Sequence, residues 1–196
     1  MIAIVDYDAG NVRSLMNALH RLGVSDPDLT SDPDRLSSAD KVFLPGVGDA
    51  SIALASLKSL GLDSVIPSLQ CPVLGICVGM QVLCRHSEEG DVSGLGIFDA
   101  DVVRFKPEDA SFKVPHMGWN RLSLLKSPLF QGFDEGTFMY FVHSYYAGIC
   151  DSTVAVSEHS VPFSAAMARG NFYGTQFHPE KSGPDGARLL SNFLSL

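Results

Sequence analysis

A cysteine between two glycines is the first residue whose surroundings suggest chemistry. The segment Gly-Ile-Cys-Val-Gly at residues 75–79 follows an apolar run and precedes a helical pattern. Cys77 is therefore expected on a sharp strand-to-helix turn of the kind that exposes a nucleophile, with glycines that permit the tight backbone. At a helix start the dipole favours the thiolate, which is the attacking form. The alternative is an ordinary buried cysteine, because free cysteine is often part of the core.

A histidine and a glutamate stand two residues apart near the end of the chain, in the segment Phe-His-Pro-Glu at residues 177–180. An extended backbone would place His178 and Glu180 on one side, with the proline fixing the chain between them. The imidazole could then take the thiol proton and later protonate the leaving group, while the carboxylate orients the ring. Alone, the motif also fits a surface turn. Combined with Cys77, its order along the chain indicates a triad assembled in space.

A second glycine-rich turn, Pro-Gly-Val-Gly at residues 45–48, follows another apolar run. Its glycines would let the N–H of Val47 approach a substrate closely. The N–H of Val78, just after the candidate nucleophile, is the expected partner. Together the two donors could form an oxyanion hole, each worth roughly 3 kcal/mol. By itself the segment also fits an ordinary turn, and the sequence leaves open whether the donors are prealigned.

The elements that must position these residues alternate between strand and helix in the first half of the chain. The expected strands cover residues 2–7, 41–44 and 72–76, and the expected helices cover residues 12–22 and 52–60 and a stretch that begins near Gly79. Such alternation predicts a parallel sheet covered by helices on both faces, with ligands at the carboxyl ends of the strands. Both glycine-rich turns fall at that edge.

The second half has a different pattern, with short strands separated by turn residues. The expected strands cover residues 96–105, 137–143, 153–157, 163–169 and 172–177, and a closing helix covers residues 185–196. The predicted fold is an α/β three-layer sandwich, with a largely parallel central sheet flanked by helices and antiparallel strands in the C-terminal half. No repeat or linker divides the chain, so residues 1–196 are expected to form a single domain.

Composition narrows the function classes. Of 196 residues, 45% are hydrophobic, and 22 acidic against 14 basic residues give a net charge of −8, which disfavours binding to nucleic acid or anionic membranes. The longest nearly apolar stretch, residues 71–84, is shorter than the roughly 18–20 residues of a membrane span. The start of the chain is typical of a buried strand rather than a signal peptide. The four cysteines lack zinc-site or disulfide spacing. A cytoplasmic protein without metal or cofactor is expected.

Three motifs together resemble the class I (triad) glutamine amidotransferases, and they occur in the family's order. They are Pro-Gly-Val-Gly at residues 45–48, Gly-Ile-Cys-Val-Gly-Met-Gln at 75–81 and Gln-Phe-His-Pro-Glu at 176–180. Within that family the chain resembles the glutaminase subunits of imidazole glycerol phosphate synthases over nearly its whole length. The most specific segment is Pro-His-Met-Gly-Trp-Asn at residues 115–120.

The resemblance implies that Cys77, His178 and Glu180 hydrolyse L-glutamine to glutamate and ammonia through a thioester. It also implies a heterodimer with a cyclase subunit, a (β/α)₈ barrel that receives the ammonia. There the ammonia would join a phosphoribulosyl nucleotide to form imidazole glycerol phosphate and AICAR in histidine biosynthesis.

Five further residues match glutamine-binding positions of the family: Gly48, Gln81, Glu89, Ser144 and Tyr145. Their chemistry agrees with that role. Gln81 follows Cys77 by one helical turn and should face the same pocket, and the carboxylate of Glu89 could hold the ammonium group of glutamine. Gln81 as a helix surface residue and Glu89 as a solvated loop acid are the alternatives.

The resemblance assigns a second set of residues to the cyclase interface: Asn11, Pro115, Met117, Trp119, Asn120 and Lys181. Aromatic residues and Met are enriched at protein interfaces. Composition alone slightly favours the alternative that Trp119, the only tryptophan, belongs to the core. His143 is expected near the mouth of the pocket in a structural role.

Three other functions stay open. The chain could supply ammonia for anthranilate, aminodeoxychorismate or pyridoxal phosphate synthesis instead. It could be a noncatalytic subunit of the same fold, although its three triad positions are intact. It could also be a cysteine peptidase or another cysteine hydrolase built on the same kind of turn.

Overall fold

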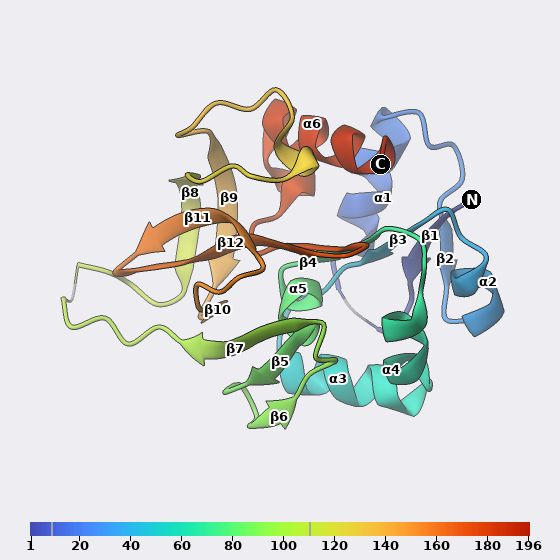
Figure 1. Ribbon diagram of the computed structural model, residues 1–196, viewed down its shortest axis with the longest axis horizontal. Helices are drawn as coiled ribbons and strands as arrows, with labels where there is room; N and C mark the ends of the chain where they lie inside the picture. Colours follow the sequence, from blue (N-terminus) through green and yellow to red (C-terminus); the bar gives the residue numbers. More distant parts are fainter. Residues whose placement is uncertain (9, 110) are drawn as a thin grey trace.

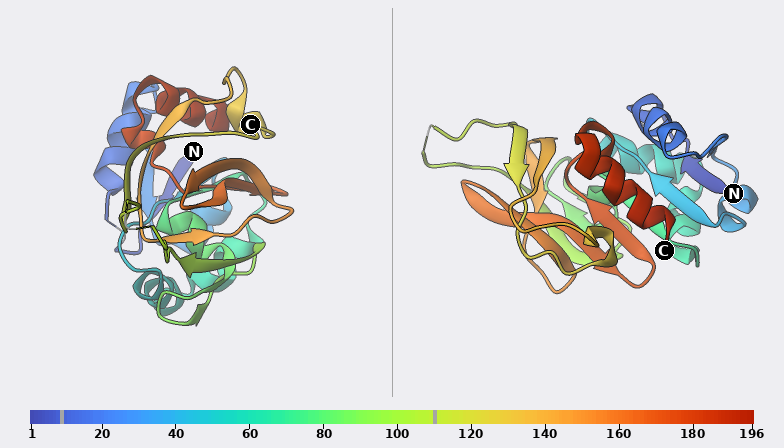
Figure 2. Two further views of the ribbon diagram at one scale, coloured as in Figure 1. Left: turned by 90° about the vertical axis from the view of Figure 1, so that its left-hand side faces the viewer. Right: turned by 90° about the horizontal axis from the view of Figure 1, so that it is seen from above.

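A computed structural model describes residues 1–8, 10–109 and 111–196. The described chain is organised around one seven-stranded sheet, whose arrangement is shown in Figures 1 and 2. The strand order is β11 (Thr153–His159), β12 (Val161–Arg169), β13 (Phe172–Thr175), β4 (Val73–Ile76), β3 (Lys41–Leu44), β1 (Ile2–Val5) and β2 (Asp28–Thr30). The five strands from β13 to β2 are parallel, and β12 and β11 add to them antiparallel. The predicted largely parallel sheet is confirmed.

Helices cover both faces of this sheet and make three layers (Figure 1). The helices are α1 (Val12–Arg21), α2 (Pro33–Ser37), α3 (Ala50–Ser59), α4 (Leu62–Val65), α5 (Val78–Val82) and α6 (Gly183–Leu194). In Figure 1, α1 and α6 lie above the sheet and α3, α4 and α5 below it. The apolar stripe of α6 is buried, and Phe193 meets Phe43 of β3 edge to face at 5.0 Å. Burial of this stripe is what attaches the closing helix to the sheet.

Two smaller sheets flank the central one. A four-stranded sheet has the order β10 (Tyr145–Ala147), β7 (Phe98–Arg104), β5 (Cys84–Ser87) and β6 (Val92–Ser93), and a two-stranded ribbon pairs β8 (His116–Arg121) with β9 (Phe138–His143). Figure 1 shows the ribbon at the end of the molecule opposite the chain's N-terminus. Short 3₁₀ helices complete the fold: η1 (Ile66–Ser68), η2 (Pro128–Phe130) and η3 (Pro179–Lys181).

The structure departs from the predicted pattern in a few places. β13 belongs to the C-terminal half but pairs parallel with β4, and β7 pairs parallel with β5. The helix expected near Gly79 has only five residues, and strand β5 begins at Cys84 directly after the turn that ends it. None of the helices formed by residues 1–8, 10–109 and 111–196 is long and apolar enough to cross a membrane.

Candidate active site

Cys77 lies at the turn between β4 and α5. Its backbone has φ 56° and ψ −110°, a strained left-handed φ for a residue with a side chain. Its N–H donates to the carbonyl of Thr175 at 2.7 Å, which ties the turn to strand β13. The flanking glycines are needed for space, since a Cβ on Gly75 would lie 2.6 Å from the Gly79 oxygen and one on Gly79 would lie 1.8 Å from the Leu44 oxygen. The turn is the sharp strand-to-helix elbow expected from the sequence.

His178 and Glu180 meet by a different route from the one predicted. His178 has an extended backbone, but Pro179–Lys181 form the 3₁₀ turn η3, so the expectation of an extended chain through Glu180 is wrong. The tight turn nevertheless brings Nδ1 of His178 to 2.8 Å from Oε1 of Glu180. Both side chains are almost fully buried, at 1% exposure each. Asn11 also donates its side-chain amide to Oε1 of Glu180, which fixes the carboxylate from the side of α1.

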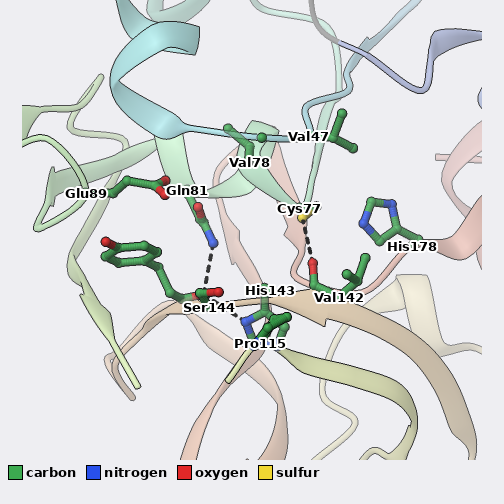
Figure 3. A pocket seen from close by; sticks show the side chains of 12 residues that line it. Val47, Cys77, Val78, Gln81, Glu89, Pro115, Val142, His143, Ser144 and His178 are labelled. Carbon is green, nitrogen blue, oxygen red and sulfur yellow. Dashed lines mark hydrogen bonds between the residues drawn. The ribbon is translucent and has the colours of Figure 1, made fainter. Parts of the chain in front are cut away.

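The imidazole of His178 lies beside the sulfur of Cys77 (Figure 3). Burial works against the charged ring, but the interactions with Cys77 and Glu180 outweigh it and raise the pKa of His178 to about 10. Nε2 of His178 is buried and makes no regular hydrogen bond within the described part of the chain. This nitrogen is the one left to exchange a proton with the sulfur, since Nδ1 is engaged by Glu180.

A cavity of about 280 Å³ opens above the sulfur (Figure 3). All five predicted glutamine-binding residues line it together with the elbow and the histidine: its walls are Val47, Gly48, Cys77, Val78, Gln81, Glu89, Pro115, Val142, His143, Ser144, Tyr145 and His178. These residues come from segments spread between positions 47 and 178. The carboxyl ends of parallel strands and the β9–β10 corner therefore converge on one pocket.

Gln81 and Glu89 are held by hydrogen bonds inside this pocket. Gln81 is 3% exposed, so it is not a surface residue of its helix, and its Nε2 donates to the carbonyl of Tyr145 at 3.0 Å. Glu89 accepts a hydrogen bond of 2.8 Å from the N–H of Ala50 at the start of α3. Burial raises the pKa of Glu89, and the nearby charge of Asp49 acts in the same direction. Glu89 is therefore a partly buried acid rather than a freely solvated one.

The two expected oxyanion donors do not converge in this structure. The N–H of Val78 donates to the carbonyl of Gly46 at 3.3 Å. In a trans peptide the N–H and C=O point in opposite directions, so the N–H of Val47, on the same peptide plane as that carbonyl, is turned away from Val78. Gly46 itself is tightly packed, because a Cβ there would lie 2.7 Å from the N of Gly79 and 2.8 Å from the Tyr7 hydroxyl. The Gly46 carbonyl, rather than the N–H of Val47, therefore faces the N–H of Val78.

The predicted interface residues divide into two groups. Met117 and Trp119 on the ribbon are 63% and 56% exposed, so the alternative that Trp119 is core is wrong. Pro115 and Lys181 are also exposed. The side chains of Asn11 and Asn120 instead make hydrogen bonds within the chain, Asn120 to the carbonyl of Glu158 at 2.8 Å.

The ribbon is fastened directly to the histidine segment. The N–H of His178 donates to the carbonyl of Tyr140 on β9 at 2.9 Å, and the N–H of Tyr140 donates to Oγ of Ser182 at 3.0 Å. The exposed Trp119 ring packs edge to face on Tyr140, with ring centroids 6.1 Å apart. The exposed apolar residues of the ribbon therefore stand next to the segment that carries His178.

Three neighbours of the sulfur received no role from sequence reasoning. Nε2 of Gln176 lies 3.7 Å from Sγ of Cys77, and the thiol lies 3.9 Å from the carbonyl of Val142. Tyr7 is buried behind the Gly46 turn and donates its hydroxyl to the carbonyl of Pro45. Gln176 directly follows β13, and Cys77 directly follows the neighbouring strand β4. The sequence does not show that these two strands are neighbours, so no sequence signal identified Gln176.

No group of three or more His, Cys, Asp or Glu side chains among the described residues is arranged to hold a metal ion. All four cysteines are free thiols. The thiol, the imidazole and the carboxylate lie next to one another in that order. These groups can catalyse acyl transfer through a covalent cysteine intermediate.

The chain is similar to known proteins over nearly its whole length. A family model described as Glutamine amidotransferase class-I matches residues 3–196. The chain is 55% identical over 195 residues to the imidazole glycerol phosphate synthase subunit HisH of Bacteroides thetaiotaomicron, covering 100% of this chain and 99% of that protein. It is 45% identical over 197 residues to the subunit of the same name from Escherichia coli, with the same coverage. A crystal structure of a glutamine amidotransferase shares the fold, with TM-score 0.75, 18% identity, and coverage of 100% of this chain and 98% of that one.

Proposed function

Because the chain belongs to the class I glutamine amidotransferase family, we propose that it is the glutaminase subunit of an imidazole glycerol phosphate synthase in histidine biosynthesis. One observation carries the proposal: the cysteine elbow and the imidazole that Glu180 holds line a single cavity in a chain that matches HisH subunits end to end. L-Glutamine is the substrate, and glutamate and ammonia are the products of this subunit.

The first half of the proposed reaction forms a thioester. His178 accepts the thiol proton, and the sulfur of Cys77 attacks the side-chain amide carbon of glutamine, so that a C–S bond forms and the carbonyl oxygen becomes an oxyanion. When the oxyanion collapses, the C–N bond breaks and His178 gives its proton to the departing ammonia. The raised pKa of His178 supports this role, because the ring keeps its proton until the leaving group needs it.

The second half hydrolyses the thioester. His178 takes a proton from water, the resulting hydroxide attacks the thioester carbon, and the C–S bond breaks to release glutamate and restore the thiol. Glu180 holds the Nδ1 side of the ring throughout, so that Nε2 faces the reacting atoms. Glutamine is bound within the cavity by Gly48, Gln81 and Glu89. Its backbone end is held by Ser144 and Tyr145.

We propose that the ammonia passes to a cyclase subunit, a (β/α)₈ barrel that forms a heterodimer with this chain. The exposed Met117 and Trp119 of the ribbon support a contact surface beside the site, because large apolar side chains of this kind form the centres of interfaces. Pro115 and Lys181 extend that surface. The four free thiols support a reducing compartment, and we place the complex in the cytoplasm.

The hydrogen bond from Val78 to Gly46 supports a further part of the proposal, namely that the isolated chain is a weak glutaminase. The Gly46–Val47 peptide must rotate before both N–H groups can face an oxyanion. Binding of the cyclase with its nucleotide would favour the rotated peptide, since a partner can shift an equilibrium only by its preference for one state.

The test is release of ammonia from glutamine by the purified chain alone, with the cyclase of the same organism, and with cyclase plus its nucleotide. We expect low release alone and a large rise in the full mixture. A rise with an anthranilate, aminodeoxychorismate or pyridoxal phosphate synthase component in place of the cyclase would overturn the assigned partner. Hydrolysis of peptides or esters with no ammonia from glutamine would overturn the assigned reaction.

A further inference from the structure

The side chain of Gln176 lies against the nucleophile and is fully buried. Its position follows from the sheet, because β13 and β4 are parallel neighbours in which Thr175 pairs with Ile76. Gln176 and Cys77 are thus the first residues beyond two adjacent strand ends. The N–H of Gln176 donates to the carbonyl of Ala165 at 2.8 Å, so its backbone is fixed as well.

The orientation of the Gln176 amide is determined by its other neighbours. A backbone carbonyl can only accept hydrogen bonds, so Nε2 of Gln81 must be the atom that faces the Tyr145 oxygen at 3.0 Å. Nε2 of Gln81 also lies 3.0 Å from the Gln176 side chain, which must therefore present its acceptor, Oε1. The NH₂ group of Gln176 is then left to face Sγ of Cys77 at 3.7 Å. The reverse orientation would set two NH₂ groups against each other.

The Tyr145 carbonyl that begins this chain of hydrogen bonds is itself held in place. Nδ1 of His143 donates to it at 2.8 Å, which makes Nε2 of His143 an acceptor for Nδ1 of His116 at 2.9 Å. Asn120 Nδ2 in turn lies 3.2 Å from Nε2 of His116. Every contact in this row, from Asn120 on the ribbon to the sulfur of Cys77, therefore pairs one donor with one acceptor.

The titratable groups of His178 and Tyr7 both interact with Cys77. Two uncharged polar groups, one an acceptor and one a donor, also face the sulfur. The Val142 carbonyl at 3.9 Å is an acceptor and favours the neutral thiol, which can donate to it. The Gln176 amide is a donor and favours the thiolate. We propose that Gln176 is a positioning residue for the nucleophile: its amide N–H stabilises the thiolate of Cys77 and fixes the position of the sulfur. The reaction that this thiolate performs rests on the proposed function.

The experiment measures alkylation of Cys77 by iodoacetamide as a function of pH in the full chain, with the modified peptide quantified by mass spectrometry. Gln176→Met keeps the side-chain length and removes the donor, and we expect alkylation of Cys77 at pH 7 to slow about tenfold, because the thiolate loses a stabilising hydrogen bond. Gln176→Glu keeps the shape and faces the sulfur with an acceptor, and it should slow alkylation at pH 7 further.

A matched control separates this effect from loss of packing. Ser164→Ala removes another fully buried hydrogen-bonding group, one that bonds Thr153 and the Gly148 carbonyl and does not touch the sulfur. It should leave the pH profile of Cys77 unchanged. An unshifted profile in a folded Gln176→Met chain would overturn the inference, and if that variant does not fold, an unshifted profile in Gln176→Glu would do so.

A second readout in the complex with the cyclase distinguishes this inference from the function on which it rests. Gln176→Met should lower kcat about tenfold for glutamine-dependent synthesis and change KM less than about twofold, because the amide acts on the sulfur. An unchanged kcat would count against Gln176 and leave the proposed function intact. A shifted alkylation profile in a chain whose wild type releases no ammonia from glutamine would support Gln176 and refute the proposed function.

Discussion

The catalytic side chains of the pocket are already arranged for reaction, whereas the backbone of the neighbouring glycine turn is not. Glu180 already holds His178 at 2.8 Å, and both are buried beside the sulfur. Across the same cavity, the Val78 N–H is bonded to the Gly46 carbonyl, and Val47 is 36% exposed. The groups that would supply the nucleophile and proton are in place, whereas those that would stabilise the oxyanion are not.

The difference has a physical basis. The histidine and glutamate are fixed by a short turn, by Asn11 and by burial, so moving them would break several interactions together. The Gly46–Val47 peptide is held on one side by a single hydrogen bond to Val78, and Gly48 with φ 93° follows it. Rotation of this peptide plane changes ψ of Gly46 and φ of Val47, and the change at Gly46 costs little because glycine is permissive in φ and ψ. A partner could therefore control activity through this turn without disturbing the triad.

The largest effect is expected from removing the nucleophile. Cys77→Ala should lower glutamine-dependent synthesis by the complex at least about a thousandfold, because no thioester can form. Synthesis from added ammonium salts should stay within about twofold of wild type, since the cyclase then needs no glutaminase. The measurement is the rate of product formation with each nitrogen source. Equal loss with both sources would show that the residue supports the complex rather than the chemistry.

The next test acts on the glycine turn and leaves the three triad residues unsubstituted. Gly46→Ala places a Cβ 2.7 Å from the N of Gly79 and 3.0 Å from Cβ of Val78, so the turn must shift against the elbow and its peptide loses the observed packing. We expect glutaminase activity of the complex to fall about a hundredfold, the worth of one oxyanion donor. Gly148→Ala is the matched control, because a Cβ there meets nothing within 4 Å.

The readout for this pair is activation, the ratio of ammonia release with and without cyclase and nucleotide. The ratio should collapse toward one in Gly46→Ala and stay normal in Gly148→Ala. A normal activation ratio in a folded Gly46→Ala complex would show that the glycine turn does not limit the activity of the isolated chain. The contrast between a formed triad and an unformed oxyanion hole would then have no functional meaning.

A third test asks whether the cyclase binds this chain at the β8–β9 ribbon, next to the triad. Trp119→Ala should weaken cyclase binding about tenfold or more, because a large exposed aromatic ring is a typical interface anchor. Ile52→Ala is the control, since Ile52 is 70% exposed on α3, and it should change the affinity less than about twofold. Titration calorimetry measures both. Equal affinity in wild type and Trp119→Ala would move the interface elsewhere.

The smallest expected effect is a shift in pH dependence. The pKa of His178 is raised to about 10, so its protonated ring should persist through the neutral range, and kcat/KM of the complex should fall only as the pH rises through about 10. The same sign applies to stability: the contribution of the charged ring is complete below its ordinary pKa of about 6.5 and is lost as the pH rises through the raised value.

Glu180→Gln tests the cause of that shift. Without the carboxylate, the alkaline limb of kcat/KM should move down by about one pH unit or more. The position of the limb is the measurement, whatever the height of the profile. A limb that stays near pH 10 in Glu180→Gln would assign the raised pKa to Cys77 alone.

Much of the site was predictable because its motifs are local. The elbow at Cys77, the glycine turn before Gly48 and the pairing of His178 with Glu180 each depend on a few consecutive residues. The predicted extended backbone at Glu180 was wrong because proline also suits the first position of a 3₁₀ turn, and η3 begins there. Trp119 is exposed although apolar residues are usually buried, since the two-stranded ribbon leaves one of its faces uncovered.

The sequence by itself determined the family, the parallel sheet and the order of the reacting groups. Each follows from short motifs and from the alternation of strand and helix patterns along the chain. Only the tertiary structure decided what the atoms of these groups contact: Val78 bonded to Gly46, Asn11 bonded to Glu180, and Gln176 placed beside the sulfur. Each of these contacts joins segments distant along the chain. Which atoms meet depends on strand order and on the rotation of single peptide planes, and neither is encoded in a local motif.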